Sequence, residues 1–422
     1  MKTKIKFSIV GLLLLLAVAP VQAELYMDGF LQGLYGGRLD QNNPTATEQT
    51  ASETRMQLRA EHFGDVGEFF GRIDFTYDAA DSAGLEVELR EAFMKFRLGS
   101  SLDVKAGRQI LTWGTGDLIF INDVFAKDYR SFFVGRDDQY LKAPQTAIRT
   151  DFYAGKLGSF SFVWTPRFEP NRLPTGRKLS YFNGQGIVGE GYFFDVPTPE
   201  SKFENGEFAF RYQRRLGNFT SALYFYRGFY KNPMGAVMVP MGESFMPMPV
   251  YPELAVYGAS VRGPLFGGIL WLEGGMFDNQ DDPDGDNPLM PNSSVTGMLG
   301  FERQVATNLT ANLQWQADFM MDHDKYVAER EGSGMYIRDE VRHLVTSRIT
   351  RLLMDENLTL SGFVFFSPTD EDWYARVSAA YKYSDEITLT VGGNAFDGKD
   401  ESTEFGQFQL NDNVYLKMTY GF

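Results

Sequence analysis

The sequence predicts an all-β protein, a transmembrane antiparallel β-barrel of about 18 strands, with 16 as the alternative count and one long loop folded inward. Three observations predict this fold. The chain begins with an export leader, its later segments alternate apolar and polar residues, and the links between those segments are short and long in succession. The domain prediction is a signal peptide over 1–23 and an outer-membrane β-barrel over 24–422.

The first 23 residues have the parts of a secretory signal peptide. Lys2, Lys4 and Lys6 precede an apolar run over 9–18, and small residues follow up to Ala23. This run is shorter than the roughly 20 apolar residues that a spanning helix needs. We therefore expect cleavage of the leader and a mature chain that starts near Glu24.

Composition narrows the class of protein. The 37 Phe, 21 Tyr and 43 Gly suit short strands, tight turns and aromatic girdles at membrane interfaces. The absence of cysteine excludes disulfides, thiolate metal sites, lipid modification of the N-terminus and covalent haem, so we expect no cofactor. The formal charge is −15, and −18 without the three leader lysines, which argues against nucleic acid as a partner.

Apolar and polar residues alternate in several segments, as they do in strands with two different faces. The alternation is clear over 55–61, 72–77 and 309–319. A barrel strand would point its apolar residues at lipid and its polar residues into the lumen. A soluble β-sandwich alternates as well, with its apolar face inward, so alternation leaves the two folds open.

The lengths of the links favour the membrane barrel, which has short periplasmic turns, longer outer loops and an even number of strands. Short turns are expected near residues 65, 99, 156, 217, 264, 306, 355 and 384, and the longest links over 113–143, 168–204 and 231–251. The predicted strands are 25–36, 52–63, 67–78, 85–98, 101–112, 144–155, 157–167, 205–216, 218–230, 252–263, 266–278, 293–305, 307–320, 339–353, 357–367, 371–383, 385–397 and 411–422.

The last predicted strand alternates apolar and polar residues and ends at Phe422. An apolar strand with a terminal Phe resembles the signal by which outer-membrane proteins engage the barrel-assembly machinery. The alternative is an ordinary edge strand. We expect Phe422 to engage that machinery and outer-membrane lipid to surround the barrel.

Several short motifs resemble the alginate-export-type porins and their porin-like relatives. They are Leu89-Arg90-Glu91-Ala92-Phe93, Ala106-Gly107-Arg108-Gln109, Trp113-Gly114, Asn122-Asp123-Val124-Phe125, Phe405-Gly406-Gln407-Phe408, Asn413-Val414-Tyr415 and Tyr420-Gly421-Phe422. The resemblance implies an 18-stranded porin-like barrel over essentially the whole mature chain. The acidic balance of this chain departs from a basic alginate conduit.

The alternation also predicts which charged side chains face the lumen. The candidate pore-lining arginines are Arg55, Arg59, Arg72, Arg90, Arg97, Arg149 and Arg211. Arg90 and Arg97 differ in parity along one strand, so both can face inward only if a β-bulge separates them. A field from these arginines would favour anions. The alternative is that they pair with Glu61, Asp74, Glu86, Glu88 and Asp151 and stiffen the wall.

The link from Trp113 to Ala143 is predicted to fold into the barrel and form its constriction. A link of this length is usually functional or disordered, and its apolar residues, from Leu118 to Phe133, are too numerous for disorder. Lipid cannot cover an irregular backbone, whereas the barrel interior can. We expect arginines of the wall to meet Asp117, Asp123 and Asp128. The alternative is a cap over the rim or a contact with a neighbouring subunit.

The sequence also contains three histidines, an acidic loop and a link rich in methionine and proline. His62, His323 and His343 fall on separate predicted elements, so we expect no enzyme. An acidic loop over 278–286 could hold Ca²⁺ or be a solvated loop, and no metal site is assigned. A link rich in methionine and proline over 232–251 suits adaptable apolar contacts with the pore mouth, a neighbouring subunit, an apolar solute or a protein.

These observations predict an outer-membrane porin for small solutes, anions among them, because barrels of 16 to 18 strands usually enclose an aqueous channel. One alternative is a sheath around a cytochrome partner that carries electrons. The other is an exporter of a polymer or lipid received from periplasmic components. The oligomeric state is left open: the chain could act alone, as a homo-oligomer, or with a periplasmic or cytochrome partner.

Overall fold

The fold was analysed in a computed structural model, which describes residues 25–64, 67–81, 84–191, 195–242, 244–332 and 336–422. The predicted signal peptide, 1–23, and the expected mature terminus, Glu24, lie outside these residues. Within them, no helix is long and apolar enough to cross a bilayer.

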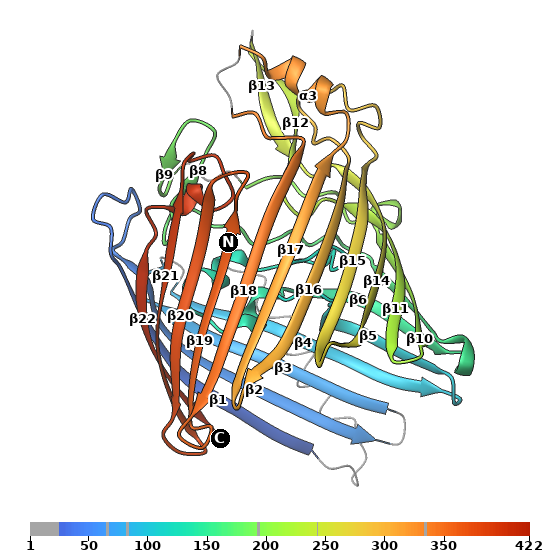
Figure 1. The fold of residues 1–422 in the computed structure, drawn as a ribbon, viewed down its shortest axis with the longest axis vertical. Coiled ribbons are helices and arrows are strands. Elements are labelled where there is room, and N and C mark those ends of the chain that lie inside the picture. The colour runs from blue at the N-terminus through green and yellow to red at the C-terminus, as the bar shows by residue number, and fades with distance from the viewer. Residues whose placement is uncertain (1–24, 65–66, 82–83, 192–194, 243, 333–335) are drawn as a thin grey trace.

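Eighteen antiparallel strands form one closed sheet, because β1 pairs with β22 as well as with β2 (Figure 1). The count of 18 is confirmed and the alternative of 16 is wrong. The barrel strands are β1 (Leu25–Arg38), β2 (Gln49–Gly64), β3 (Gly67–Asp78), β4 (Leu85–Leu98), β5 (Leu102–Ile110), β6 (Pro144–Tyr153), β7 (Ser159–Thr165), β10 (Glu207–Leu216), β11 (Phe219–Phe229), β14 (Glu253–Leu265), β15 (Gly268–Asn279), β16 (Ser294–Ala306), β17 (Leu309–Met320), β18 (Val341–Leu353), β19 (Leu358–Ser367), β20 (Asp372–Lys382), β21 (Ile387–Gly398) and β22 (Asn413–Gly421).

Smaller elements lie in the links between these strands. Two hairpins, β8 (Tyr181–Phe182) with β9 (Ile187–Val188) and β12 (Gly235–Met241) with β13 (Ser244–Val250), belong to the loop end. The helices are α2 (Tyr129–Phe132), α3 (His323–Arg330), η1 (Asp138–Leu141), η2 (Gly155–Leu157), η3 (Phe203–Asn205) and η4 (Gly406–Phe408). The β8–β9 and β12–β13 hairpins and α3 lie at one end of the barrel, and the C-terminus lies at the other (Figure 1).

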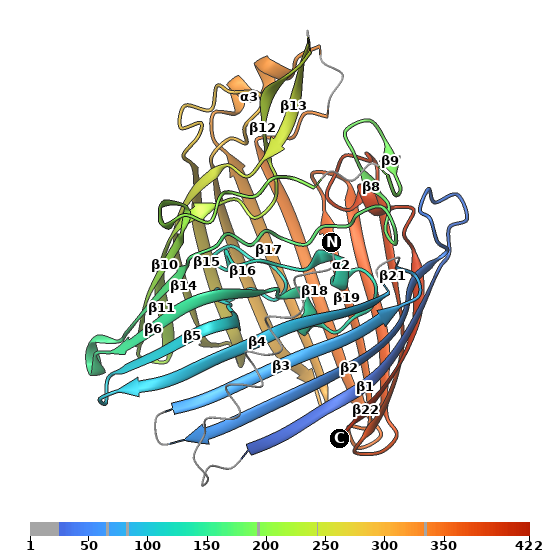
Figure 2. The same cartoon turned by 180° about the vertical axis from the view of Figure 1, so that it is seen from behind.

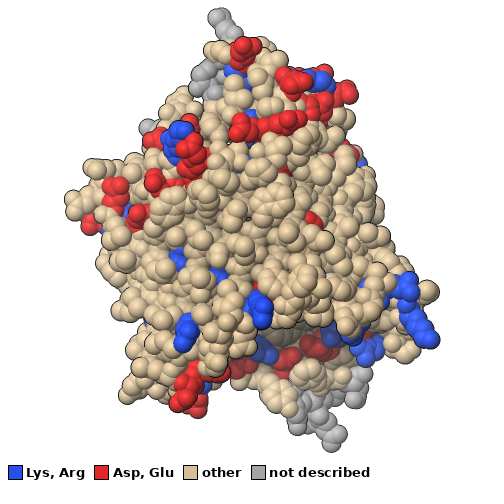
Figure 3. All heavy atoms as spheres, in the orientation of Figure 1, with Lys and Arg blue, Asp and Glu red and all other residues tan. Residues whose placement is uncertain are grey.

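The wall has its apolar side chains outside and its polar side chains inside, the reverse of a soluble protein. On β17, Leu313 is 58% exposed and Trp315 is 47% exposed, whereas Gln314 between them is 1% exposed. Figure 3 shows a middle band of the outer surface with few charged atoms, between charged ends. This pattern suits a wall that faces lipid outside and a polar lumen inside, and it separates the membrane barrel from the soluble sandwich.

A β-bulge interrupts the pairing of β3 and β4. Arg72 pairs with Glu91, and the next residue, Ile73, pairs with Leu89, so Arg90 is the extra residue. Both Arg90 and Glu91 are buried as a result. The extra residue shifts the alternation of β4 by one position, so Arg90 before the shift and Arg97 after it can both face the lumen. This is the bulge that the sequence required.

The structure gives two further links a definite form. The methionine-rich link over 232–251 is mostly the β12–β13 hairpin, which was not among the predicted strands. In the acidic loop, the Asp282 carboxylate accepts the backbone N–H groups of Asp286 and Asn287, and Asp281 accepts that of Glu253. Among the described residues no group of acidic or histidine side chains is placed to hold a metal ion. These carboxylates therefore stabilise the turns of the loop.

Candidate functional site: the loop across the lumen

The link from Trp113 to Ala143 lies inside the barrel, as predicted, and contacts strands on several sides of it. Figure 2 shows α2, which belongs to this link, within the ring of strands. The backbone N–H of Asp117 donates to the side chain of Gln314 on β17, and Arg136 donates to Glu53 on β2. The prediction that this loop folds inward is confirmed, and the alternative of a cap over the rim is wrong.

A buried carboxylate on β15, Glu273, holds the first half of the loop. It accepts the backbone N–H of Thr115 at 2.5 Å and that of Asn122 at 2.9 Å. It also accepts the Thr115 hydroxyl at 2.6 Å and the Asn122 amide at 3.0 Å. Four donors satisfy a carboxylate that would otherwise be costly to bury, so Glu273 fixes where the loop leaves the wall.

Glycine in the wall lets the loop approach closely. A Cβ added at Gly258 on β14 would lie 1.7 Å from Oδ1 of Asn122. No side chain fits at that position while Asn122 keeps its place. The close approach also explains how the Asn122 amide reaches the carbonyl of Gly274 at 3.2 Å.

A group of three ion pairs holds the second half of the loop. The carboxylate of Asp138 in η1 accepts from Arg348 on β18 at 3.2 Å and from Arg376 on β20. Its neighbour Asp137 pairs with Lys417 on β22. Burial opposes ionisation of Asp138, but the guanidiniums of Arg376 and Arg348 outweigh it, and the pKa of Asp138 lies below its ordinary value. The loop is therefore joined to three strands by charge.

The apolar residues of the loop pack against lumen-facing aromatic side chains. Phe132 and Phe133 contact Tyr374 edge-to-face at centroid distances of 5.6 and 5.4 Å. Phe125 packs on Trp113 in a second cluster that includes Tyr224 of β11. The apolar side chains of the loop are therefore removed from water by packing against the inner face of the wall, which stabilises the docked loop.

One of the three predicted aspartates, Asp117, has the kind of partner that was expected. Asp117 meets an arginine of the wall, Arg348, at 2.8 Å. Burial raises the pKa of Asp117, and the nearby charge of Arg348 opposes that rise.

The expectation of a wall arginine is wrong for Asp123 and Asp128. Asp123 pairs with Lys127 of the same loop at 3.0 Å. Burial lowers the pKa of Lys127, and the charge of Asp123 opposes this effect. Asp128 caps α2 through the N–H of Ser131 and pairs with Arg172 of the next long link at 3.3 Å. Asp123 therefore stabilises the fold of this loop, and Asp128 joins it to the next long link.

The pairing register places the seven predicted arginines on the inner face of the wall, and three of them touch the inward loop. Arg55 and Arg90 lie over the ring of Tyr140, with 4.0 and 4.4 Å from each guanidinium carbon to the centroid. Arg211 lies over Trp113 at 5.4 Å. These three arginines line the part of the lumen that the loop occupies.

Most of the seven arginines also have a carboxylate partner on the wall. The pairs are Arg55 with Glu53 and Asp74, Arg59 with Asp28 and Glu61, Arg72 with Glu91, Arg90 with Glu88, Arg97 with Asp103, and Arg149 with Asp151. Among the described residues, Arg211 has no such partner and donates to the Ser161 hydroxyl at 3.3 Å. Pairing with carboxylates, the alternative that the sequence left open, therefore describes six of the seven arginines.

A row of basic side chains crosses neighbouring strands on the inner face. Lys95 on β4 is opposite Lys105 on β5, which is opposite Arg149 on β6. β7 lies between β6 and β10, and Arg211 on β10 is two residues along its strand from this row. Lys105 has no carboxylate partner within 4.0 Å among the described residues and lies over the ring of Phe93 at 3.6 Å. Lysines were not considered as pore-lining residues, although their parity on β4 and β5 was available from the alternation.

Comparison with known proteins places this geometry in a family and a fold. The family model described as a protein of unknown function, DUF1302, matches residues 32–318. No curated protein sequence matches the chain. The crystal structure of Acinetobacter baumannii OccAB4 is similar with a TM-score of 0.56, at 12% identity over 96% of this chain and 100% of that one.

Two structures from Pseudomonas aeruginosa are also similar. One is OccK2 (OpdF) in complex with glucuronate, with a TM-score of 0.57 at 10% identity over 94% of this chain and 98% of that one. The other is OccD3 (OpdP), with a TM-score of 0.53 at 11% identity over 94% and 91% of the two chains. The porin-like fold implied by the sequence motifs is thus confirmed, and the chain belongs to the DUF1302 family.

Proposed function

We propose that this protein is an outer-membrane porin that lets small solutes, anions among them, pass through the lumen. The observation that carries the proposal is the loop 113–143, which is anchored across a lumen whose wall is charged and whose outer face is apolar. A channel needs a lipid-facing wall, a polar interior and an element that narrows the passage. The inward loop is proposed as that constriction.

The basic row on β4, β5, β6 and β10 supports a preference for anions. Lys105 and Arg211 have no carboxylate partner among the described residues, so their charges are less neutralised than those of the paired arginines. Clustered charge in a narrow lumen concentrates solutes of the opposite sign. The similar OccK2 structure was solved with glucuronate, which is an anion. Both observations favour small anions over cations for this chain.

Reconstitution of the protein in a planar bilayer tests this function. We expect discrete conductance steps and a reversal potential in a salt gradient that indicates anion preference. Lys105→Gln together with Arg211→Gln should reduce that preference, because both remove charge from the lumen. Lys382→Gln, at the exposed end of β20, is the matched control and should leave it unchanged. Absence of conductance, or a clear preference for cations, would reject the proposal.

The alternatives have less support. A sheath around a cytochrome needs a lumen that accepts a second protein, but the loop 113–143 already occupies it and is bonded to β2, β15, β17, β18 and β20. An exporter of the alginate type, or of a lipid, would need the same space. A red, haem-containing protein that copurifies with the barrel would support the sheath instead.

Export and assembly are part of the proposal. We propose that residues 1–23 are removed and that Phe422 engages the assembly machinery. Phe422 lies at the end of β22, is exposed, and exchanges two backbone hydrogen bonds with Gly29 of β1. N-terminal sequencing of the mature protein and the yield of folded barrel from Phe422→Ala test these two points.

A further inference from the structure

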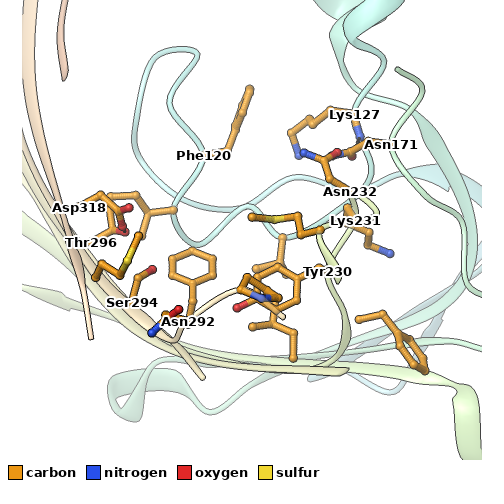
Figure 4. A pocket seen from close by; sticks show the side chains of 18 of the residues that line it. Phe120, Lys127, Asn171, Tyr230, Lys231, Asn232, Asn292, Ser294, Thr296 and Asp318 are labelled. Atoms are coloured by element: carbon orange, nitrogen blue, oxygen red, sulfur yellow. Dashed lines mark hydrogen bonds between the residues drawn. The ribbon is translucent and has the colours of Figure 1, made fainter. Parts of the chain in front are cut away.

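A second feature of the loop end is a cavity of about 370 Å³. It is bounded by the inward loop at Phe120, by the wall at Phe277, by the base of the β12–β13 hairpin at Met234 and by α3 at Tyr326. Its volume is within the range of small-molecule sites, about 300–1,000 Å³. Figure 4 shows polar side chains on two sides of the pocket, Asp318, Thr296 and Ser294 on one and Lys127, Asn171 and Asn232 on the other. The cavity is separate from the anchors of the loop and from the basic row.

Aromatic rings and thioethers make up much of the lining. The apolar lining includes Phe120, Phe125, Tyr230, Phe277, Met234 and Met290. Methionine is flexible and polarizable, so such a surface adapts to different apolar shapes. Uncharged hydrogen-bonding groups are also present, among them Ser294 and Thr296 on the wall and Asn232 opposite them.

The charges around the cavity are matched in pairs. Lys127 pairs with Asp123 at 3.0 Å, and Lys231 pairs with Glu207 at 2.6 Å. Arg338 pairs with Asp318 at 3.4 Å.

The fourth cation, Arg330, has Glu329 at 4.0 Å and lies over the ring of Tyr326 at 3.9 Å. A site for an anion would leave a cation available to it, and here each of the four lining cations has a carboxylate nearby. The cavity therefore suits an uncharged ligand.

We propose that this cavity binds an uncharged, largely apolar ring compound that carries one or two hydrogen-bonding groups. Rings such as Phe120 and Phe277 would contact its faces, and Ser294, Thr296 or Asn232 would bond its polar group. The site would then serve a different class of solute from the basic row. The inference goes beyond the proposed porin function and does not depend on conductance.

The β12–β13 hairpin gives such a solute an apolar approach. Phe245 is 67% exposed and Met246 is 48% exposed, and Met234 at the base of the hairpin lines the cavity. The N–H of Ala236 donates to the carbonyl of Leu289 at 2.8 Å, which fixes the hairpin beside the cavity. Exposed apolar surfaces of this kind often mark sites of binding.

Two fluorophores with the same ring system test the inference. N-phenyl-1-naphthylamine is uncharged, and 1-anilinonaphthalene-8-sulfonate adds one negative charge. Each is titrated into the full-length barrel in nanodiscs, and the signal of empty nanodiscs is subtracted. We expect saturable binding of the uncharged probe. Binding of the sulfonate should be at least about tenfold weaker, because the cations of the lining already have carboxylates nearby. A factor of ten corresponds to about 1.4 kcal/mol.

Ser294→Phe fills the cavity from the wall, and Ser361→Phe is its matched control. Both serines are on barrel strands, but Ser361 is not part of the lining. Ser294→Phe should weaken binding of the uncharged probe by about tenfold or more, because it removes the apolar area available to the ligand. Ser361→Phe should bind like the wild type. Heat-dependent mobility on a gel confirms that each variant is a folded barrel.

Three results would overturn the inference. They are the absence of saturable binding of N-phenyl-1-naphthylamine, equal binding by the folded Ser294→Phe and Ser361→Phe variants, and binding of the sulfonate as tight as that of the uncharged probe. Loss of binding in Met234→Ala, an exposed position with a small packing role, provides a second variant in case Ser294→Phe does not fold. The folded Met234→Ala barrel must then bind more weakly than Ser361→Phe.

Discussion

At the scale of single residues, Asp138 joins the inward loop to two strands of the wall at once. One carboxylate accepts from two arginines on two different strands, β18 and β20. Without its charge, Arg376 would remain largely buried and Arg348 would retain only Asp117. An unpaired guanidinium in a narrow lumen is costly, so the loop would be held less firmly.

Asp138→Asn is therefore expected to loosen the loop. Losing hydrogen bonds to charged groups costs about 1–3 kcal/mol, and the loop should leave its docked position more often. Single-channel recordings should show higher or noisier conductance than the wild type. Asp385→Asn, on an exposed turn, removes the same charge and should have no effect. Identical recordings for the two variants would show that Asp138 does not hold the loop.

The two carboxylates on Arg348 should titrate in a fixed order. The pKa of Asp117 is raised by burial, and that of Asp138 is lowered because its guanidinium partners outweigh burial. On acidification Asp117 takes up a proton first. The contribution of Asp138 is present above its unfolded pKa and is lost only as pH falls through its lower folded pKa.

This order predicts the pH dependence of the channel. Wild-type conductance should be stable down to about pH 4, near the ordinary value for Asp, because Asp138 remains ionised. In Asp138→Asn, Arg348 keeps only Asp117, whose pKa is raised, so the conductance of this variant should change at a higher pH. Recordings from pH 7 to pH 4 measure both. A wild-type transition at the same pH as that of the variant would contradict the assigned roles.

At the scale of elements, the strands were predictable and some of the links were not. All 18 barrel strands were predicted, and β3 and β4 have the predicted bounds. Alternation is strong in a barrel because lipid and lumen select opposite side chains at every second residue. The β12–β13 hairpin was missed because Pro240, Pro247 and Pro249 argue against a strand in a sheet. A two-stranded hairpin has free edges, which tolerate them.

The inward loop was predictable from its length and apolarity, but most of its anchors were not. Glu273, Arg348 and Arg376 are more than 100 residues away in sequence, and nothing local indicates which strand faces which part of the loop. The wrong partners of Asp123 and Asp128 have the same origin. Their nearest cations are in loops, and the sequence analysis considered only arginines of the wall.

Deletion of residues 118–133 tests whether this loop is the constriction. The deletion removes α2 and the apolar residues that pack on Phe363 and Tyr374, while the flanking strands remain. Single-channel conductance should rise and ion selectivity should fall, because the lumen would lose the element that we propose as its constriction. If the shortened protein inserts as a folded barrel and conducts as before, the constriction lies elsewhere.

At the scale of the whole molecule, alternation determined the strands but could not by itself determine the side that faces water. The side that faces water is determined by the whole barrel together. Side chains such as Leu313 and Trp315 form an exposed apolar outer surface, while polar residues line a closed interior. The predicted signal peptide and the alternation of short and long links indicated a membrane barrel, and the pairing of β1 with β22 closes the sheet. The distribution of charge within the lumen required the register of every strand.

Closure leads to a prediction for the entire barrel. Each strand is hydrogen-bonded to two neighbours, so the sheet has no free edge from which unfolding could begin. In detergent the apolar outer face stays covered, and the backbone bonds of the sheet persist without heat. The native barrel should therefore migrate differently on a denaturing gel before and after boiling, and it should fractionate with outer membranes. Identical mobility in both samples, combined with recovery in the soluble fraction, would reject a membrane barrel.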